Sequence, residues 1–468
     1  MHLNGNFKVN ATPQQVWQKI TNPGLMAACI PGCESIEQID AATYQAVVAV
    51  GVGVVKAKFN LLVEVVEENP PFEVLSKTSG LEGGRTSTLT AENRVWLTEL
   101  DDGTRVDYES EVSITGRLGK FGLGIMRKHV EKMSAKFAVN FQSGILEQGS
   151  PAEFSAIDEK VESENLATTS GQAYAQNTVE DSTNTSVSTQ NALLWPKTVD
   201  EAVAVLSNTS GSQPLAGGAT LIAMRNAGLI NVKQYVSLER VDGIQGITIQ
   251  PDGSIRIGAM TRHRDTAACE NLTGNLVVLR QAAGSIASMP VRNMGTMGGS
   301  LANADPAADY LAALTCLDAS VEIVGPRGTR SIGINEFITD WYETVLGHGE
   351  IITAVILPPS CDGYSSYRKV ARVSGDYAVA SCAISTSAEK TIRIAIGGCG
   401  PSPIRLKHAE FSLGRGNFSD NEIDSYSGQL IRLADPVDDV RGSAEYRRNL
   451  IPQLVRDAFA GLEKNRGI

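Results

Sequence analysis

The chain has 468 residues, of which 42% are apolar and 20% are charged, and its formal net charge is −11. At roughly 100–200 residues per domain, this length predicts two to four domains. No apolar stretch approaches the roughly 20 residues that span a bilayer, the N-terminus MHLNGNFKVN lacks the pattern of a signal peptide, and the acidic balance argues against nucleic-acid binding. We therefore expect a cytoplasmic protein with no nucleic-acid partner.

Seven cysteines, an odd number, are scattered along the chain. There is no pair of C-x₂-C motifs to predict a structural zinc site, and the clustered thiolates of an iron–sulfur centre are missing. The close pair Cys29 and Cys33 flanks a Pro-Gly turn. We interpret these residues as small, partly buried thiols in a reducing cytoplasm, with a redox or metal pair as the alternative. No metal site is therefore expected in this chain.

Residues 1–148 alternate apolar and polar side chains over long runs. Two runs place apolar residues on one face: Phe59, Leu61, Val63 and Val65 in the first, and Val106, Tyr108, Val112 and Ile114 in the second. Period two over this length predicts half-buried antiparallel strands. A short helix is expected to begin at Pro13, with Thr12 as its cap.

A long amphipathic helix is predicted near the end of this part. Its apolar stripe follows the helical period and consists of Met126, Val130, Met133, Phe137 and Phe141. A curved sheet closed over this helix is the simplest arrangement that buries both apolar faces. The space between them is either a plain core or a cavity for an apolar ligand, and methionine suits both alternatives.

Three stretches of this part resemble a known family: VWQKITNPGLMAACIPGCESIE, GVGVVKAKFNLLVEVVEENPP and GRLGKFGLGIMRKHVEKMSAKF. They are similar to the G subunit of carbon monoxide dehydrogenase, of the START-like (SRPBCC) helix-grip superfamily, and the likeness covers nearly all of residues 1–148. It implies a hydrophobic-cavity fold with no catalytic residues to transfer. It also implies a role in assembly, membrane association or quinone handling for a dehydrogenase.

Residues 149–190 are expected to form a flexible acidic linker. Within residues 151–190 there are one basic and seven acidic side chains among many Ser, Thr, Asn and Gln residues, and no apolar period. Such a segment buries too little surface to offset the entropy of ordering. The part that follows opens with a predicted helix, because Thr198 and Glu201 have the spacing of a capping box.

Two glycine pairs stand out in this second part: Gly217-Gly218 in PLAGGATL and Gly298-Gly299 in VRNMGTMGGSL. Without a Cβ, the backbone reaches positive φ and approaches a ligand closely, and successive N–H groups converge on an anion. Either pair alone is more typical of an ordinary tight turn than of a ligand site. Neither loop has the G-x-G-x-x-G or P-loop pattern, so Rossmann and P-loop folds are not supported.

The order of the motifs is more specific than either loop. PLAGGATL, VRNMGTMGGSLANADPAADYLAAL, EIITAVILP, YRKVARVSGDYAVAS and SAEYRRNLIPQLV together resemble the medium, FAD-binding subunit of molybdenum hydroxylases, the carbon monoxide and xanthine dehydrogenase family. The resemblance implies an α+β chain. It implies a vanillyl-alcohol-oxidase-type FAD-binding domain at 191–360 and a smaller α/β C-terminal domain at 361–468.

The resemblance also assigns cofactor positions. The two pyrophosphate loops would be formed by Ala216, Gly217, Gly218, Ala219 and Thr220, and by Thr296, Met297, Gly298, Gly299 and Ser300. Asp309 matches an acidic position near the flavin and ribityl chain, and Ile352 a position whose backbone approaches the flavin. Lys369, or its neighbour Arg368, matches a basic position near the isoalloxazine. Tyr377 matches a residue that covers the flavin face.

Each of these single residues also has a purely structural interpretation. Asp309 could be a first-turn helix charge, Tyr377 a core tyrosine, and Lys369 a solvated charge at a strand edge.

We therefore expect an electron-transfer subunit that holds FAD non-covalently. It would pass electrons from a partner's iron–sulfur clusters to an external acceptor. The implied partners are a molybdopterin-binding large subunit and a [2Fe–2S] small subunit, with a quinone or other apolar ligand in the N-terminal domain. A peripheral position at the inner face of the membrane is the alternative to a purely cytoplasmic one. The alternative functions are a self-contained flavin oxidoreductase and an apolar-ligand carrier or assembly protein.

Overall fold

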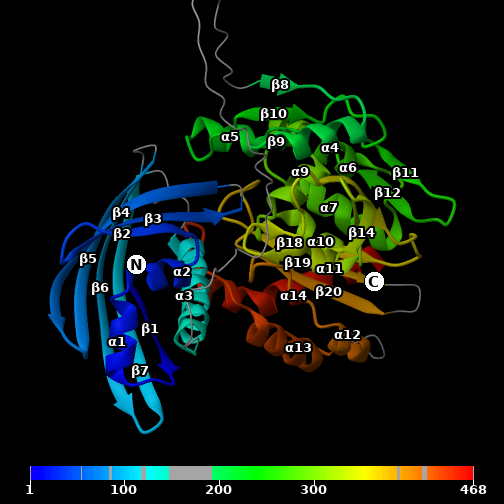
Figure 1. The fold of residues 1–468 in the computed structure, drawn as a ribbon. Coiled ribbons are helices and arrows are strands. Elements are labelled where there is room, and N and C mark those ends of the chain that lie inside the picture. The colour runs from blue at the N-terminus through cyan, green and yellow to red at the C-terminus, as the bar shows by residue number, and fades with distance from the viewer. Residues whose placement is uncertain are drawn as a thin grey trace, which may run out of the picture.

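The computed structural model describes residues 2–53, 55–83, 87–116, 123–146, 192–386, 391–413 and 419–466. Figure 1 shows two lobes, a curved sheet formed before residue 117 and a mixed lobe that begins at residue 192. Helix α3 (Leu123–Leu146) lies between the curved sheet and the second lobe (Figure 1). The expected linker, residues 149–190, lies outside the described residues, so its flexibility stays a prediction.

The first lobe is a seven-stranded antiparallel sheet in the order β1-β7-β6-β5-β4-β3-β2. Its strands are β1 (His2–Val9), β2 (Cys33–Gln38), β3 (Thr43–Val52), β4 (Val55–Asn69), β5 (Glu73–Glu82), β6 (Ser87–Leu100) and β7 (Gly103–Gly116). The alternation predicted for this lobe is present, since Phe59 and Val106 are buried at 2% and 3% exposure. The sheet and α3 therefore have the predicted arrangement.

Two short helices, α1 (Pro13–Ile20) and α2 (Pro23–Cys29), connect β1 to β2. Helix α1 begins where the sequence predicted: the Thr12 hydroxyl accepts from the Gln15 backbone N–H, and the Gln15 side chain accepts from the Thr12 N–H. Helix α2 was not predicted, although Asn22 followed by proline is a start signal, and the Asn22 side chain accepts from Leu25 N–H at 3.0 Å.

The second lobe begins with a small parallel sheet in the order β8-β10-β9. Its elements are β8 (Ala192–Leu194), α4 (Val199–Asn208), β9 (Ser212–Leu215), α5 (Leu221–Asn226) and β10 (Gln234–Ser237). Helix α4 starts at the predicted place, and the Thr198 hydroxyl accepts from Glu201 N–H at 3.1 Å. The Glu201 carboxylate accepts from the N–H of Lys197 instead of Thr198, so half of the predicted capping box forms.

A five-stranded antiparallel sheet in the order β11-β12-β17-β13-β14 follows. Its strands are β11 (Ile247–Ile249), β12 (Ile255–Gly258), β13 (Ser320–Gly325), β14 (Gly328–Gly333) and β17 (Ile351–Leu357). The helices of this region are α6 (His263–Ala268), α7 (Val277–Ser285), α8 (Met289–Met294), α9 (Met297–Asn303), α10 (Asp309–Cys316) and α11 (Ile334–Phe337). A two-stranded hairpin, β15 (Ile338–Asp340) with β16 (Glu343–Thr344), projects from this region.

The C-terminal region has an antiparallel three-stranded sheet and three helices. They are β18 (Ser365–Val370), β19 (Ala380–Thr386), β20 (Ile392–Gly397), α12 (Lys407–Leu413), α13 (Asp420–Leu433) and α14 (Ala444–Arg466). Residues on both sides of position 360, including Tyr310 and Tyr367, share one buried core. The domain boundary expected at 360–361 is therefore crossed by continuous packing.

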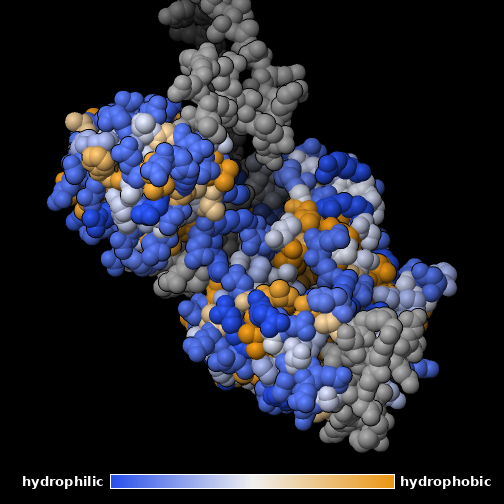
Figure 2. Space-filling model, turned by 90° about the horizontal axis from the view of Figure 1, so that it is seen from below, coloured by the Kyte–Doolittle hydropathy of each residue, from blue (hydrophilic) through white to orange (hydrophobic). Residues whose placement is uncertain are grey.

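Among the described helices, none is both long enough and apolar enough to cross a membrane. Figure 2 shows the molecule from below, where hydrophilic residues cover most of both lobes and hydrophobic residues form smaller patches on the surface of each lobe.

Candidate functional site

The two predicted glycine loops lie next to each other. The first, residues 216–220, joins β9 to α5, and the second, residues 296–300, forms the start of α9. A Cβ placed on Gly299 would lie 3.5 Å from the Cβ of Ala216. A Cβ on Gly217 would lie 1.8 Å from the carbonyl oxygen of Met294, just before the second loop. Glycine at 217 is therefore required by the packing of one loop against the other.

The first loop presents unused backbone donors. Gly218 has φ +76°, a conformation that favours glycine. Among the residues that the structure describes, none accepts a hydrogen bond from the backbone N–H groups of residues 217–220. Adjacent N–H groups around a residue of positive φ form a concave anion-binding surface. The first loop therefore has the geometry expected for a phosphate site.

The second loop differs from this expectation. The N–H groups of Met297 and Gly298 donate to the carbonyls of Thr261 and Ala259 at 3.0 and 2.8 Å. Those of Gly299 and Ser300 donate to the side chain and carbonyl of Thr296. Thr296 caps α9, so these four N–H groups, which the sequence suggested for a ligand, all have protein partners. The second loop is thus a fixed wall beside the first.

Asp309, Tyr367 and Lys369 form a buried polar group. The Tyr367 hydroxyl donates to Asp309 Oδ1 at 2.7 Å, and Lys369 Nζ lies 3.0 Å from the same oxygen. Lys369 also donates to the carbonyls of Ser285 and Asp376 at 2.8 and 3.0 Å. Burial raises the pKa of Asp309, and the Lys369 charge opposes this. The alternative interpretation of Lys369 as a solvated strand-edge charge is wrong, since its side chain is 9% exposed.

Strand alternation places Lys369 and Arg368 on opposite sides of β18. Tyr367 and Lys369 point to the side of β18 that faces Asp309. Arg368 points to the other side, where its Nε donates to the Asp457 carbonyl on α14. Lys369 is therefore the basic residue on the face that carries the other predicted positions.

Tyr377 contacts the first glycine loop. Its side chain forms a hydrogen bond with Thr220, and the Arg441 guanidinium lies 5.1 Å from the centre of its ring. Burial raises the pKa of Tyr377 to about 12, so the phenol is neutral at physiological pH. The backbone of the neighbouring Asp376 accepts from Lys369, which connects the loop to the buried group described above.

Ile352 lies in the central strand β17 and is 5% exposed. The carbonyl of the next residue, Thr353, accepts from Ala259 N–H at 2.9 Å, and the Ala259 carbonyl accepts from Gly298. The side chain of Ile352 is part of the core. Two hydrogen bonds therefore link this strand to the second loop through Ala259.

Sequence reasoning missed a second polar group beside Tyr377. Asp305 follows α9 and is 8% exposed; its side chain forms a hydrogen bond with Tyr342, and burial raises its pKa. Arg441 provides the nearby positive charge, which opposes this rise in the pKa of Asp305. Asp305 precedes a proline close to the second loop, which was an available signal. Tyr342 and Arg441 lie in unremarkable sequence, and nothing in the sequence pointed to them.

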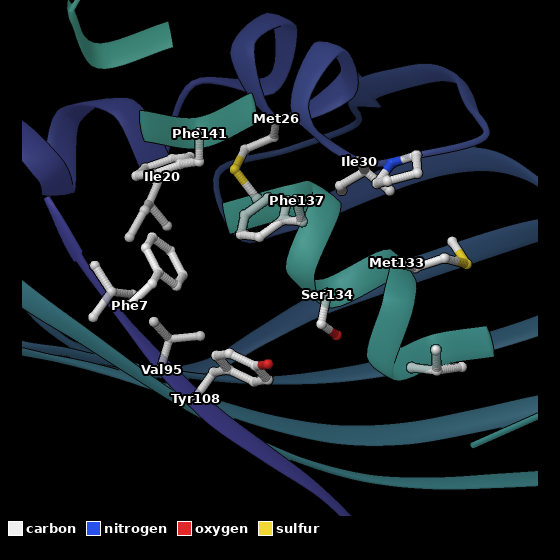
Figure 3. Close-up of a pocket in the computed structure, with 13 residues that line it drawn as sticks. Phe7, Ile20, Met26, Ile30, Val95, Tyr108, Met133, Ser134, Phe137 and Phe141 are labelled. Atoms are coloured by element: carbon white, nitrogen blue, oxygen red, sulfur yellow. The ribbon is translucent and has the colours of Figure 1, made fainter. Parts of the chain in front are cut away.

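The first lobe contains an apolar cavity of about 270 Å³ between the sheet and α3. Its wall includes Phe7, Met26, Val106, Phe137 and Phe141, and Figure 3 shows the hydroxyl groups of Tyr108 and Ser134 among these apolar side chains. The apolar stripe of α3 left open whether a plain core or a cavity lies between the helix and the sheet, and the structure contains a cavity.

Three family models match successive parts of the chain. The model of the carbon monoxide dehydrogenase G subunit (CoxG) matches residues 5–146. The FAD binding domain in molybdopterin dehydrogenase matches residues 186–360, and the CO dehydrogenase flavoprotein C-terminal domain matches residues 365–462.

Relatives of known function cover the second lobe. The glyceraldehyde dehydrogenase medium chain of Sulfolobus acidocaldarius is 31% identical over 56% of this chain and 95% of its own length. The carbon monoxide dehydrogenase medium chain of Hydrogenophaga pseudoflava is 30% identical over 56% of this chain and 94% of its own. A chain of the solved carbon monoxide dehydrogenase from the latter organism superposes with a TM-score of 0.56 at 29% identity, covering 59% of this chain and 98% of that one. The chain therefore belongs to the family of FAD-binding medium subunits of molybdenum hydroxylases, and it carries a CoxG-like domain at its N-terminus.

Proposed function

We propose that this chain is the electron-transfer flavoprotein subunit of a molybdenum hydroxylase complex. It would receive electrons from the iron–sulfur clusters of a [2Fe–2S] small subunit and release them to an external acceptor, while a molybdopterin-binding large subunit oxidises the organic substrate. The observation that carries the proposal is the run of unused N–H groups at residues 217–220, beside Tyr377 and the fixed second loop.

The residues of this region fit FAD. Unused N–H donors around Gly218 suit the pyrophosphate, and Tyr377 places an aromatic ring at the same loop. Lys369, fixed by Asp309 and two carbonyls, would keep a positive charge near the flavin ring. Bound FAD would accept and release electrons, and the protein would set its position and access. The contacts are all non-covalent.

We also assign the cavity of the first lobe to an apolar ligand, with a quinone as the candidate. A ring system with polar substituents fits walls of phenylalanine, valine and methionine that carry the two hydroxyls of Tyr108 and Ser134. A role confined to assembly of the complex is the alternative for this lobe.

Purification of the full chain tests the flavin assignment. The purified protein should be yellow and should release FAD on denaturation. NADH or a quinol should reduce the bound flavin, and the chain alone should not oxidise organic substrates. A colourless protein that does not take up added FAD would contradict the flavin assignment. Oxidation of an organic substrate by the chain alone would favour a self-contained oxidoreductase.

Filling the cavity tests the apolar-ligand assignment. Ser134→Trp places an indole inside the cavity, whereas Ala135→Trp places it on the exposed face of the same helix. The first variant should lose binding of the neutral fluorescent probe N-phenyl-1-naphthylamine, and the second should keep it. Equal binding by both variants would place the probe elsewhere and remove support for the cavity as a ligand site.

A further inference from the structure

The apolar cavity of the first lobe adjoins a second hollow between the lobes. This hollow has a volume of about 200 Å³, and Pro31 and Met133 line both spaces. Most of its wall comes from the first lobe, but Glu343 belongs to the hairpin β15–β16 of the second lobe. Met133 lies beside Ser134 at the edge of the cavity in Figure 3. One end of the cavity therefore faces the flavin-binding lobe.

Charged contacts join α3 to this hairpin. Lys132, the neighbour of Met133, forms an ion pair with Asp340 at the end of β15, and its Nζ lies 3.9 Å from Glu343 Oε2. The hydrogen bond to Asp340 raises the pKa of Lys132, so the lysine stays charged at physiological pH. Further along the same helix, Lys128 Nζ lies 2.8 Å from Asp435 Oδ1. Lys128 and Lys132 of α3 thus face carboxylates of the second lobe.

The tip of the hairpin reaches the first lobe as well. A Cβ on Gly53, in the turn after β3, would lie 2.9 Å from both the Cβ and the carbonyl oxygen of Tyr342. Tyr342 has φ +58°, which is uncommon for a residue other than glycine. Leu229 and Ile230 of the second lobe also pack against the buried cluster of Ala57 and Phe59 in the first lobe. The contact therefore combines ion pairs with close packing.

The other side of Tyr342 points into the flavin-binding region. Its hydroxyl forms a hydrogen bond with the buried Asp305, and Asp305 lies close enough to act electrostatically on Tyr377, which contacts the first glycine loop. The hairpin therefore touches both the lobe that holds the cavity and the residues around the proposed flavin site.

We propose that the hairpin Ile338–Thr344 is the docking element that holds the mouth of the apolar cavity against the flavin-binding lobe, so that an apolar ligand passes between cavity and flavin site through the hollow at Pro31 and Met133. This inference rests on the proposed function, because it needs both the cavity ligand and the flavin. A direct passage spares the ligand the exposure of its apolar surface to water. The Lys132 ion pairs set the orientation of the lobes and are weakened by salt.

Zero-length cross-linking of the full chain tests the docking without reference to activity. A carbodiimide joins a lysine to a carboxylate only where the two are in contact. Peptide mapping should find Lys132 linked to Asp340 or Glu343, and the yield should fall in 1 M salt. Absence of these links in the unmodified protein at low salt would overturn the docking geometry.

Charge reversal tests the passage. Lys132→Glu should slow flavin reoxidation by stoichiometric decylubiquinone at least tenfold, and Lys132→Glu with Asp340→Lys should restore most of the rate. Lys77→Glu is the matched control, because Lys77 pairs with Glu92 inside the first lobe. An unchanged rate in Lys132→Glu would overturn the passage.

Two further measurements separate this inference from the proposed function. FAD content and binding of N-phenyl-1-naphthylamine should be the same in Lys132→Glu and the unmodified chain. Failure of the unmodified chain to bind FAD or the probe would contradict the proposed function, whereas the cross-link decides the docking in either case.

Discussion

Lys369 and Asp309 form an ion pair that is almost completely removed from solvent: Nζ lies 3.0 Å from Oδ1, and the two side chains are 9% and 5% exposed. The remaining donors of Lys369 are taken by two backbone carbonyls. The pair joins the start of α10 to β18, on opposite sides of the boundary expected at residue 360. It therefore ties the flavin-binding region to the C-terminal sheet and fixes the lysine in place.

Lys369→Met should destabilise the protein by about 3 kcal/mol, because removal of one partner leaves a buried charge without compensation. The Asp309 carboxyl would then bind a proton more readily, since burial already raises its pKa. Denaturant unfolding measures the loss. Arg368→Met is the matched control on the other face of β18, and Asp309→Asn in the Lys369→Met background should recover part of the stability. Equal losses for the two single variants would contradict a special role of the buried pair.

Gly218→Ala should lower FAD occupancy, because an L-residue in the left-handed conformation costs about 1–2 kcal/mol and Gly218 has φ +76°. Gly299→Ala should do the same by another route, since its Cβ would lie 2.9 Å from Thr296 Oγ1 and would disturb the Thr296 cap of α9 beside the first loop. The absorbance ratio of flavin to protein measures occupancy. Gly284→Ala in α7, where a Cβ meets no atom within 4 Å, should keep full occupancy. Full FAD occupancy in both loop variants would contradict the assignment of the glycine loops to the pyrophosphate site.

Tyr377→Phe should weaken FAD binding about 2- to 10-fold, because the ring is kept and only its hydrogen bond to Thr220 is lost, a net contribution of about 0.5–1.5 kcal/mol. Thr220→Val should have a similar effect, and the double variant should be little worse than either single one. Equilibrium binding of FAD to the apoprotein provides the measurement. Additive losses would show that the two side chains act independently. Tyr446→Phe, at a 47% exposed position, is the control.

His263 should make the protein less stable in mild acid. Burial lowers its pKa from 6.5 to about 4, so the unfolded chain binds this proton at a higher pH than the folded one. The contribution of neutral His263 to the free energy of unfolding is complete above pH 6.5. It decreases as the pH falls towards 4, by on the order of 3 kcal/mol. His263→Gln should reduce the pH dependence of the free energy of unfolding, measured by denaturant between about pH 7 and 4. His348→Gln, at an exposed position, should leave it unchanged. A dependence of the same slope in both variants would contradict the assignment.

Local signals in the sequence predicted local structure well. Thr12 and Pro13 marked the start of α1, and the stripe that includes Met133, Phe137 and Phe141 predicted α3 and its cavity-facing side. These predictions succeed because caps and periodic burial depend on neighbours a few residues apart. The motif order was equally informative for the second lobe, since two family models match where the resemblance was found.

The site depended on contacts that no local pattern encodes. Two donors of the second loop, the N–H groups of Met297 and Gly298, are taken by carbonyls of Thr261 and Ala259 in a different segment, so glycine content alone overstated that loop. The hydrogen bond between Tyr377 and Thr220, and that between Asp305 and Tyr342, join segments far apart in the chain. Their pairing is set by the packing of the sheets and helices within the second lobe, which becomes visible only in the folded structure.

The presence of both lobes in one chain fixes their ratio at one cavity for each flavin site. An encounter between them is unimolecular, so its rate does not depend on how dilute the protein is. A separately expressed cavity protein would compete with the fused lobe for the same contact. To displace the fused lobe, its concentration would have to approach the effective concentration of that lobe, which is millimolar for short flexible connections. The ratio of the cavity lobe to the flavin-binding lobe is therefore set by the covalent chain and does not depend on the relative expression of two genes.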